Sequence, residues 1–202
     1  RRQRQMCIRD SYVVGAEQKQ HFEMVFASAR KSGLIDSRHT TNHVPFGLVL
    51  GPDGGKLKSR SGGAVKLLDL LNEAIDRASA SVKGRNPDIT QEELGRLSRS
   101  IGIGAVKYSD LKSDRTKDYV FDWEKMLSFE GETGPYLQYA HARISSILRN
   151  DKFQKSKSGP TSFSLAHESE MRLAREIMKY PESVDQAAED LAPHRILSLI
   201  HI

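Results

Sequence analysis

Cysteine is almost absent from this sequence of 202 residues, with Cys7 as its one example. A single cysteine excludes an intramolecular disulfide framework and a zinc site built from several cysteines. Long apolar runs are absent too, since runs such as 46–50 are far shorter than the roughly 20 residues of a membrane-spanning helix. The segment 1–5 leads into no apolar stretch of the secretory type. We therefore expect a cytosolic, reducing setting and no membrane partner.

A strong charge of one sign is also lacking. The 31 Lys and Arg residues exceed the 26 Asp and Glu residues by only five, which gives a net charge of +5. This mildly basic balance permits a nucleic-acid or phosphate partner without specifying one. Hydrophobic residues make up 38% of the chain and charged residues 28%, so a packed core is possible.

The first 62 residues show an alternation of strand and helix patterns. The apolar run 12–15 predicts a buried strand, and 17–32 predicts a helix with apolar side chains three and four residues apart. The run 46–50 predicts a second strand that leads into the turn-rich segment 51–55. Strand, turn and helix in this order predict half of a β-α-β unit within an α/β domain.

From residue 64 the apolar spacing is helical almost to the end of the chain. Stripes over 68–82 and 94–105 predict two helices, and Thr90 with Glu93 predicts a capping box for the second. Thr133 precedes Gly-Pro, which is typical of a helix start. We expect an all-α bundle here.

The last third of the chain predicts a linker and two further helices. The polar segment 152–160 has the composition of a surface linker. Apolar residues in 173–178 and in 184–191 predict two separate helices, the second of which is stopped by Pro193.

Two glycine motifs fail as nucleotide-binding signatures. Gly51–Lys56 is one residue shorter than a Walker A loop, and Leu57 stands where a magnesium-binding hydroxyl is needed. The glycines in 102–104 lack a third partner and lie in a helical pattern rather than after a strand. We therefore reject both.

A basic loop is the strongest candidate site that the residues themselves offer. Cations and hydroxyls alternate along Lys56–Gly62, between a strand and a helix. Mobile cations can stabilise the charge that develops on a departing polyphosphate. The alternative interpretation is a solvated basic turn.

Two weaker candidates carry their own structural alternatives. His21 lies near the carboxyl end of the first strand, where ligands bind in open α/β sheets, but it is also an ordinary residue for a helix surface. Aromatic and basic side chains in 136–149 suit base stacking and phosphate contact, or a core helix with a solvated basic face. The segment 168–190 is acidic, so we do not expect RNA to dock broadly on it.

Four longer segments carry a family resemblance. They are 12–26, 43–51 with 58–62, 105–131 and 133–143, the last reading Thr-Gly-Pro-Tyr-Leu-Gln-Tyr-Ala-His-Ala-Arg. Together they resemble arginyl-tRNA synthetases, which are class I aminoacyl-tRNA synthetases. The segment 168–194 resembles the start of that family's helical anticodon-binding domain.

The resemblance implies an architecture of α/β followed by all-α. Residues 12–62 would form the C-terminal part of a Rossmann-type catalytic domain with a KMSKS-like loop, 63–132 a helical connection, and 133–196 the start of the anticodon-binding domain. The remaining segments, 1–11 and 197–202, match nothing in the family, so we expect non-native or disordered ends that pack on nothing. No HIGH motif occurs in the sequence, and we interpret the chain as a fragment that is inactive on its own.

The resemblance also implies a function and a set of site residues. The reaction is ATP-dependent activation of arginine, with Mg²⁺ carried by ATP, followed by transfer of arginine to tRNA(Arg). The protein would be a cytoplasmic or organellar monomer with no metal site of its own. The implied residues are Gln18 for arginine; His21, Lys56 and Lys58 for ATP; Lys56, Lys58, Ser59 and Arg60 for catalysis; and Tyr136, Gln138, Tyr139, His141 and Arg143 for tRNA.

Two other functions stay open from the residues. One is a non-catalytic helical RNA-binding protein with a synthetase-like surface. The other is a stand-alone nucleotidyl-transfer enzyme.

Overall fold

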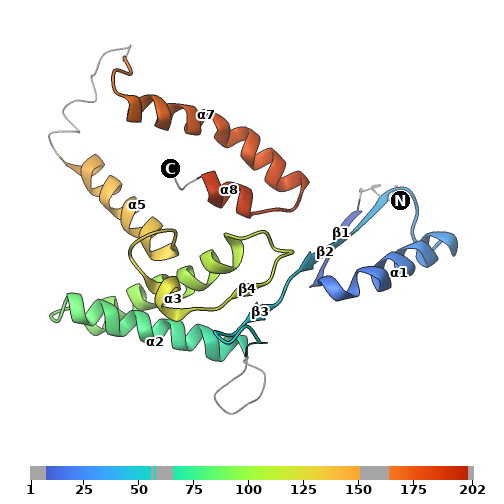
Figure 1. Cartoon of the computed structure of the whole chain (residues 1–202), viewed down its shortest axis with the longest axis horizontal. Helices are drawn as coiled ribbons and strands as arrows, with labels where there is room; N and C mark the ends of the chain where they lie inside the picture. Colours follow the sequence, from blue (N-terminus) through green and yellow to red (C-terminus); the bar gives the residue numbers. More distant parts are fainter. Residues whose placement is uncertain (1–7, 56, 58–65, 151–163, 200–202) are drawn as a thin grey trace, which may run out of the picture.

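The computed structural model describes residues 8–55, 57, 66–150 and 164–199. A small α/β lobe projects from a larger helical part (Figure 1). The lobe consists of β1 (Ile8–Gly15), the 3-10 turn η1 (Ala16–Gln18), α1 (Lys19–Lys31) and β2 (His39–Phe46). The helical part contains β3 (Val49–Leu50), α2 (Leu67–Arg85), α3 (Gln91–Leu111), β4 (Tyr119–Val120), α4 (Trp123–Leu127), α5 (Gly134–Arg149), α7 (Glu168–Glu189) and α8 (His194–Leu199).

Parallel pairing of β1 with β2 organises the lobe. The register runs from Ile8 opposite His39 to Gly15 opposite Phe46, with α1 as the crossover helix. The predicted strand–helix unit is therefore confirmed, but the strand that pairs with β1 is β2 over 39–46, whereas the predicted strand 46–50 overlaps β2 only at Phe46 and otherwise contains β3. The first residues of β2, His-Thr-Thr-Asn, form no apolar run, and an edge strand tolerates both such polar residues and Pro45.

The chain ends depart from the expectation in part. Residues 8–11 belong to β1 and pair with 39–42, and residues 197–199 belong to α8, which packs on α7. Backbone pairing and helix packing thus order segments that were expected to pack on nothing. The rest of those ends, 1–7 and 200–202, lies outside the described residues.

The main core lies between α2, α3, α4 and the β3–β4 pair. Its buried members are Ala74, Val106, Phe121 and Met126. Gly102 allows α2 and α3 to touch, since a Cβ there would lie 2.7 Å from the carbonyl carbon and oxygen of Ala74. The two glycines that were rejected above as a nucleotide motif therefore lie at helix contacts.

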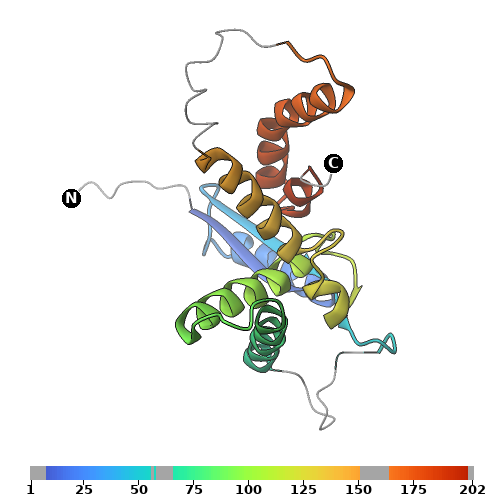
Figure 2. The same ribbon diagram turned by 90° about the vertical axis from the view of Figure 1, so that its left-hand side faces the viewer.

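Gly104, the second of these glycines, makes room for α5. A Cβ at Gly104 would lie 2.5 Å from the Gln138 amide nitrogen, which donates a 3.0 Å hydrogen bond to the Ser100 carbonyl oxygen. Close by, a Cβ on Gly134 would lie 2.8 Å from the Gly104 carbonyl oxygen. Thus α3 is in close contact with α2 through Gly102 and with α5 through Gly104. Figure 2 shows the same helices turned by a quarter rotation.

Helix starts follow the predicted capping residues. The Thr90 hydroxyl oxygen accepts from the Glu93 backbone N–H at 3.3 Å and caps α3, which is one half of the predicted capping box, while the Glu93 carboxylate lies 4.0 Å from Arg96. The Thr133 hydroxyl oxygen likewise accepts from the Tyr136 N–H at 3.1 Å and caps α5, with Pro135 in its first turn. Side-chain oxygens at these positions satisfy N–H groups that have no partner within the helix.

One long helix replaces the two that were predicted near the C-terminal end. Helix α7 runs through Pro181 without interruption. Proline removes one backbone hydrogen bond in a helix, but Ile177 and Pro181 are exposed, so water can satisfy the released carbonyl group. The predicted linker 152–160 lies outside the described residues. Within the described part of the chain, no helix has the length and apolar character needed to cross a bilayer.

Replacing Gly102 with alanine should separate α3 from α2. The new methyl group meets backbone atoms rather than a flexible side chain, so we expect a loss of about 1–3 kcal/mol in the free energy of unfolding. Gly95→Ala in the same helix is the matched control, because nothing lies within 4 Å of the position that its methyl group would take. That control should gain about 0.5–1 kcal/mol by helix propensity. Equal effects in urea unfolding would contradict this account of Gly102.

Stability should fall at alkaline pH through two tyrosines. Burial raises the pKa of Tyr119 to about 12, with a further contribution from Asp110. Burial and Glu132 raise the pKa of Tyr108 to about 12 in the same way. In the unfolded chain these tyrosines lose their protons near pH 10. The free energy of unfolding should therefore decrease between about pH 10 and about pH 12, and the two tyrosines should not affect it below about pH 10.

Tyr119→Phe should reduce that decrease in stability, measured by urea unfolding at several pH values. Tyr180→Phe, at an exposed site on α7, should leave it unchanged. Identical pH profiles for the two variants would contradict the prediction.

Candidate functional site

The carboxyl edge of the β1–β2 pair carries two of the predicted site residues. Both strands end together, with Gly15 opposite Phe46. Gln18 ends η1, His21 lies in the first turn of α1, and both are exposed. The sequence-based expectation that His21 follows a strand at its carboxyl end is confirmed. Ligands bind at this edge in open α/β sheets because helix N-termini and loops converge there.

His43 holds the start of α1 in place. Its ring stacks on Phe22 with 4.9 Å between centroids, and its Nε2 lies 3.0 Å from the Val14 carbonyl oxygen. Phe22 in turn meets the edge of the His21 ring at 5.9 Å. His43 begins one of the segments that carry the family resemblance, but no role was predicted for it. Its signal was a histidine three residues before the apolar run 46–50, and its contacts with Phe22 and Val14 hold the first turn of α1 against the two strands.

Hydrogen bonds among residues 49–57 form the base of the basic loop. Gly51 donates to the Gly55 carbonyl oxygen at 2.7 Å, and the Asp53 carboxylate accepts from the Gly55 N–H at 3.1 Å. Leu57 then donates to the Val49 carbonyl oxygen at 3.2 Å and packs against the core. The predicted catalytic residues Lys56, Lys58, Ser59 and Arg60 lie outside the described residues.

Only two residues, Gly47 and Leu48, join β2 to β3, and the loop base follows directly after β3. The Gly47 N–H donates to the Arg115 carbonyl oxygen at 2.7 Å, and the Leu48 N–H donates to the Asp118 carboxylate at 2.6 Å. A Cβ at Gly47 would lie 2.5 Å from the Lys117 carbonyl group. This crossing fixes where β2 ends relative to β3, and so where the carboxyl edge lies relative to the loop.

The predicted RNA-binding side chains on α5 divide between two faces. Tyr136, Tyr139 and Arg143 are three and four residues apart, so they share one stripe, and all three are exposed. Gln138 belongs to the other side, where its amide binds Ser100 of α3. His141 lies there too, with its Nε2 3.4 Å from the Ser145 hydroxyl. The amide contact of Gln138 was not foreseen, and it gives this residue a structural role.

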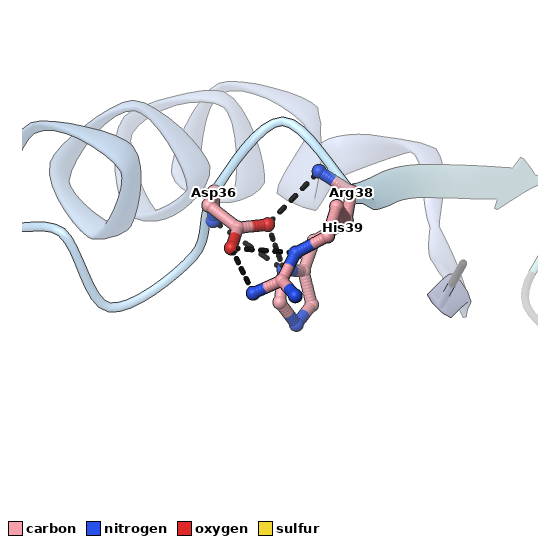
Figure 3. Close-up of polar contacts among 3 residues, drawn as sticks. All are labelled: Asp36, Arg38 and His39. Atoms are coloured by element: carbon pink, nitrogen blue, oxygen red, sulfur yellow. Dashed lines mark hydrogen bonds and ion pairs between the residues drawn. The ribbon is translucent and has the colours of Figure 1, made fainter. Parts of the chain in front are cut away.

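A polar cluster at the far end of the lobe shapes a turn. Figure 3 shows Asp36 accepting from the backbone and guanidinium of Arg38 and lying against His39. These hydrogen bonds, led by the one from the Arg38 side chain, hold the pKa of the Asp36 carboxyl well below its usual range. The cluster precedes β2, whereas Gln18 and His21 follow β1, so it lies at the opposite end of the parallel pair.

Metal-ligating side chains do not gather among the described residues. In 8–55, 57, 66–150 and 164–199, no three His, Cys, Asp or Glu side chains form a group that could hold a metal ion.

Two family models match most of the chain. The model for the catalytic domain of class I tRNA synthetases (R) matches residues 1–123, and the model for the DALR anticodon binding domain matches 137–201. These ranges include 1–11 and most of 197–202, so the expectation that the two ends match nothing in the family was wrong.

Similar proteins and structures agree with these models. An arginine–tRNA ligase of Saccharophagus degradans is 45% identical over 190 residues, and one of Cellvibrio japonicus is 42% identical. The solved structure of arginyl-tRNA synthetase from Thermus thermophilus superposes with a TM-score of 0.73 at 33% identity, covering 94% of this chain and 30% of that one. The Plasmodium falciparum enzyme gives the same TM-score at 28% identity, covering 96% of this chain and 32% of that one.

The matched region is one part of each relative. It covers 94% of this chain but 33% of the two bacterial ligases, so the chain spans about a third of their length. A catalytic-domain match over 1–123, a DALR match after it and a shared fold lead to one conclusion. The chain belongs to the class I arginyl-tRNA synthetase family.

Proposed function

We propose that this chain serves an arginine–tRNA ligase as the part that joins the ATP-binding edge of the catalytic domain to the tRNA-binding helices. The observation that carries this proposal is the link of four residues, 47–50, between the carboxyl edge of β1–β2 and the base of the basic loop, held by hydrogen bonds from its backbone to 115–118. The start of α1 and the loop are the two halves of the proposed ATP site, and this short connection along the chain supports placing both in one site. The finer assignment of the lobe as Rossmann-type belongs to this proposal.

The reaction forms arginyl-adenylate and then arginyl-tRNA. A carboxylate oxygen of arginine attacks the α-phosphorus of ATP, and the bond to pyrophosphate breaks. A ribose hydroxyl at the tRNA end then attacks the arginyl carbonyl, and AMP leaves with the bonding electrons. ATP enters as a substrate together with its Mg²⁺.

In this scheme the chain's own side chains bind arginine and ATP and stabilise the charge on the departing pyrophosphate. The Gln18 amide, which both donates and accepts, is proposed to bind arginine, and His21 to contact ATP. Lys56, Lys58 and Arg60, with the Ser59 hydroxyl, would stabilise the charge that builds on the departing pyrophosphate. These cations act on a charge that is larger in the transition state than in bound ATP, so they raise the rate of activation more than the affinity.

The tRNA contacts are proposed for the exposed stripe of α5. Tyr136 and Tyr139 are 40% and 51% exposed, enough for a base or ribose to stack on them, and Arg143 can meet a phosphate. His141 and Gln138 would contribute from the side nearer α3. A monomeric state and a cytoplasmic location stay predictions from the family resemblance.

A chimera tests the proposal. This chain would replace the matched third of the Saccharophagus degradans ligase, and arginine-dependent ATP–pyrophosphate exchange would be measured with tRNA(Arg) present. The chimera should exchange, and the triple variant Lys56→Ala, Lys58→Ala, Arg60→Ala should slow exchange by at least about 100-fold. The KM for arginine should change little, because these cations act on phosphate.

The double variant Lys31→Ala, Lys83→Ala is the control, since it removes exposed cations far from the loop in sequence. It should retain the exchange rate. A triple variant that kept its rate would assign the loop to a solvated turn. A folded chimera that bound tRNA but never exchanged would favour the non-catalytic RNA-binding alternative.

The purified chain of 202 residues should show no exchange by itself. It spans about a third of its relatives, and preorganised stabilisation needs all the groups that surround ATP. Exchange that depends on arginine and is abolished by the triple substitution would contradict this prediction. The same preparation should give a cooperative thermal transition, which separates inactivity from misfolding.

A further inference from the structure

A shallow basic groove runs along the exposed side of α3. Its volume is about 420 Å³. The residues that line it are Arg96, Arg99, Ser100, Ile103, Gly104 and Lys107. Three of these six carry a positive charge and none carries a negative one, so the groove suits an anion.

The spacing of the cations suits a chain of anions rather than a single one. Arg96, Arg99 and Lys107 follow the i, i+3, i+11 positions of one helix stripe. At 1.5 Å per residue, the first and last Cα atoms lie roughly 16 Å apart along the helix axis. A lone phosphate cannot contact both ends of such a row, whereas a nucleic-acid backbone presents charge along its whole length.

These charges are poorly satisfied within the described part of the chain. Arg96 reaches the Glu93 carboxylate only at 4.0 Å, and both side chains are largely exposed. Arg99 and Lys107 form no ion pair with any described carboxylate, whereas Arg77 is paired with Glu73 at 2.8 Å on the neighbouring helix. Exposed and unpaired cations bind phosphates without first breaking a salt bridge.

The groove is rigid on both sides. The face of α3 that points away from the groove packs on α2 at Gly102. The floor of the groove includes Ser100, whose carbonyl oxygen accepts a hydrogen bond from Gln138 of α5. The cations therefore project from a helix whose position is fixed by two packed neighbours. Preorganised charges lose less freedom on binding than charges on a loop.

The long helix α7 offers no comparable surface. Between residues 168 and 190 acidic residues number seven and basic residues three, so its net charge is negative. Among the described helices, the basic groove of α3 is thus a better electrostatic match for a phosphate backbone than α7 is.

We propose that Arg96, Arg99 and Lys107 bind the phosphate backbone of tRNA in this groove, beside the contact of α3 with Gln138 of α5. The partner's identity rests on the proposed ligase function, while the groove itself rests on geometry and charge. The contact is to phosphates, so it contributes affinity and salt dependence rather than sequence recognition.

Binding of a tRNA(Arg) transcript by the full chain tests the groove. Fluorescence anisotropy would be measured for the unaltered chain, for Arg99→Gln with Lys107→Gln, and for Lys31→Gln with Lys83→Gln as a control of equal charge. The groove variant should bind roughly 10- to 50-fold more weakly near 0.1 M salt, and its slope of log affinity against log salt should fall by about 1.4–1.8. The control should stay within about threefold of the unaltered chain.

Each contrary outcome has a defined meaning. An equal loss of RNA affinity in both variants, or no RNA binding by the unaltered chain, would contradict the proposed phosphate contacts of the groove. Direct binding of polyglutamate that is lost only in the groove variant, with RNA binding unchanged, would assign the groove to an acidic protein instead.

The chimeric ligase separates this proposal from the proposed function. The groove variant in that chimera should raise the KM for tRNA about tenfold and leave kcat unchanged. An unchanged KM in an active chimera would overturn the groove alone. An inactive chimera whose tRNA affinity still fell on the groove substitutions would overturn the ligase function and support the groove.

Discussion

Close approach of backbone to backbone at α3 is the constraint on which the helical part depends. Gly102 lets the Ala74 carbonyl of α2 come within van der Waals contact, and Gly104 and Gly134 do the same toward α5. Side chains at these positions would push the helices apart and open the core around Val106 and Phe121. Because both neighbours pack on one helix, α3 sets their relative position, and its basic groove stays exposed to other molecules.

The lobe is held together by a different interaction, an aromatic cluster between α1 and the two strands. Tyr12, Phe22, Phe26 and His43 pack with centroid distances of 4.9–5.6 Å. His43 adds a hydrogen bond to the Val14 backbone, which ties β2 to β1 behind the start of α1. The exposed His21 thus lies on a packed support, as its proposed contact with ATP requires.

Long periodic segments were predictable from the sequence, and short or polar ones were not. The stripes of α2 and α3 and the caps Thr90 and Thr133 gave clear signals because each follows from local spacing. The strands β3 and β4 have two residues each, too few for an alternation to show, and the polar start of β2 at 39–42 is ordered only by its pairing with β1. Tertiary context decided these elements.

The sequence could predict those features of the candidate site that follow from the order of strands and helices along the chain. The position of His21 after a strand could be inferred from pattern, whereas the roles of Gln18 and of the loop came from family resemblance. The structural role of Gln138 could not be inferred, because it requires Gly104, which lies 34 positions earlier in the sequence, to be adjacent in space. Pairings of this kind exist only once helices have packed.

The crossing at Gly47 and Leu48 determines where the chain can accept additional residues. With both N–H groups bonded to 115–118 and no space for a side chain at Gly47, an insertion there would break the crossing and shift the lobe. The turn at Pro52–Gly55 is exposed, and Gly54 has φ +74° with open space around it. Labels, tags or spectroscopic probes are therefore tolerated better at Gly54 than at Gly47, seven residues earlier, although both positions precede the basic loop.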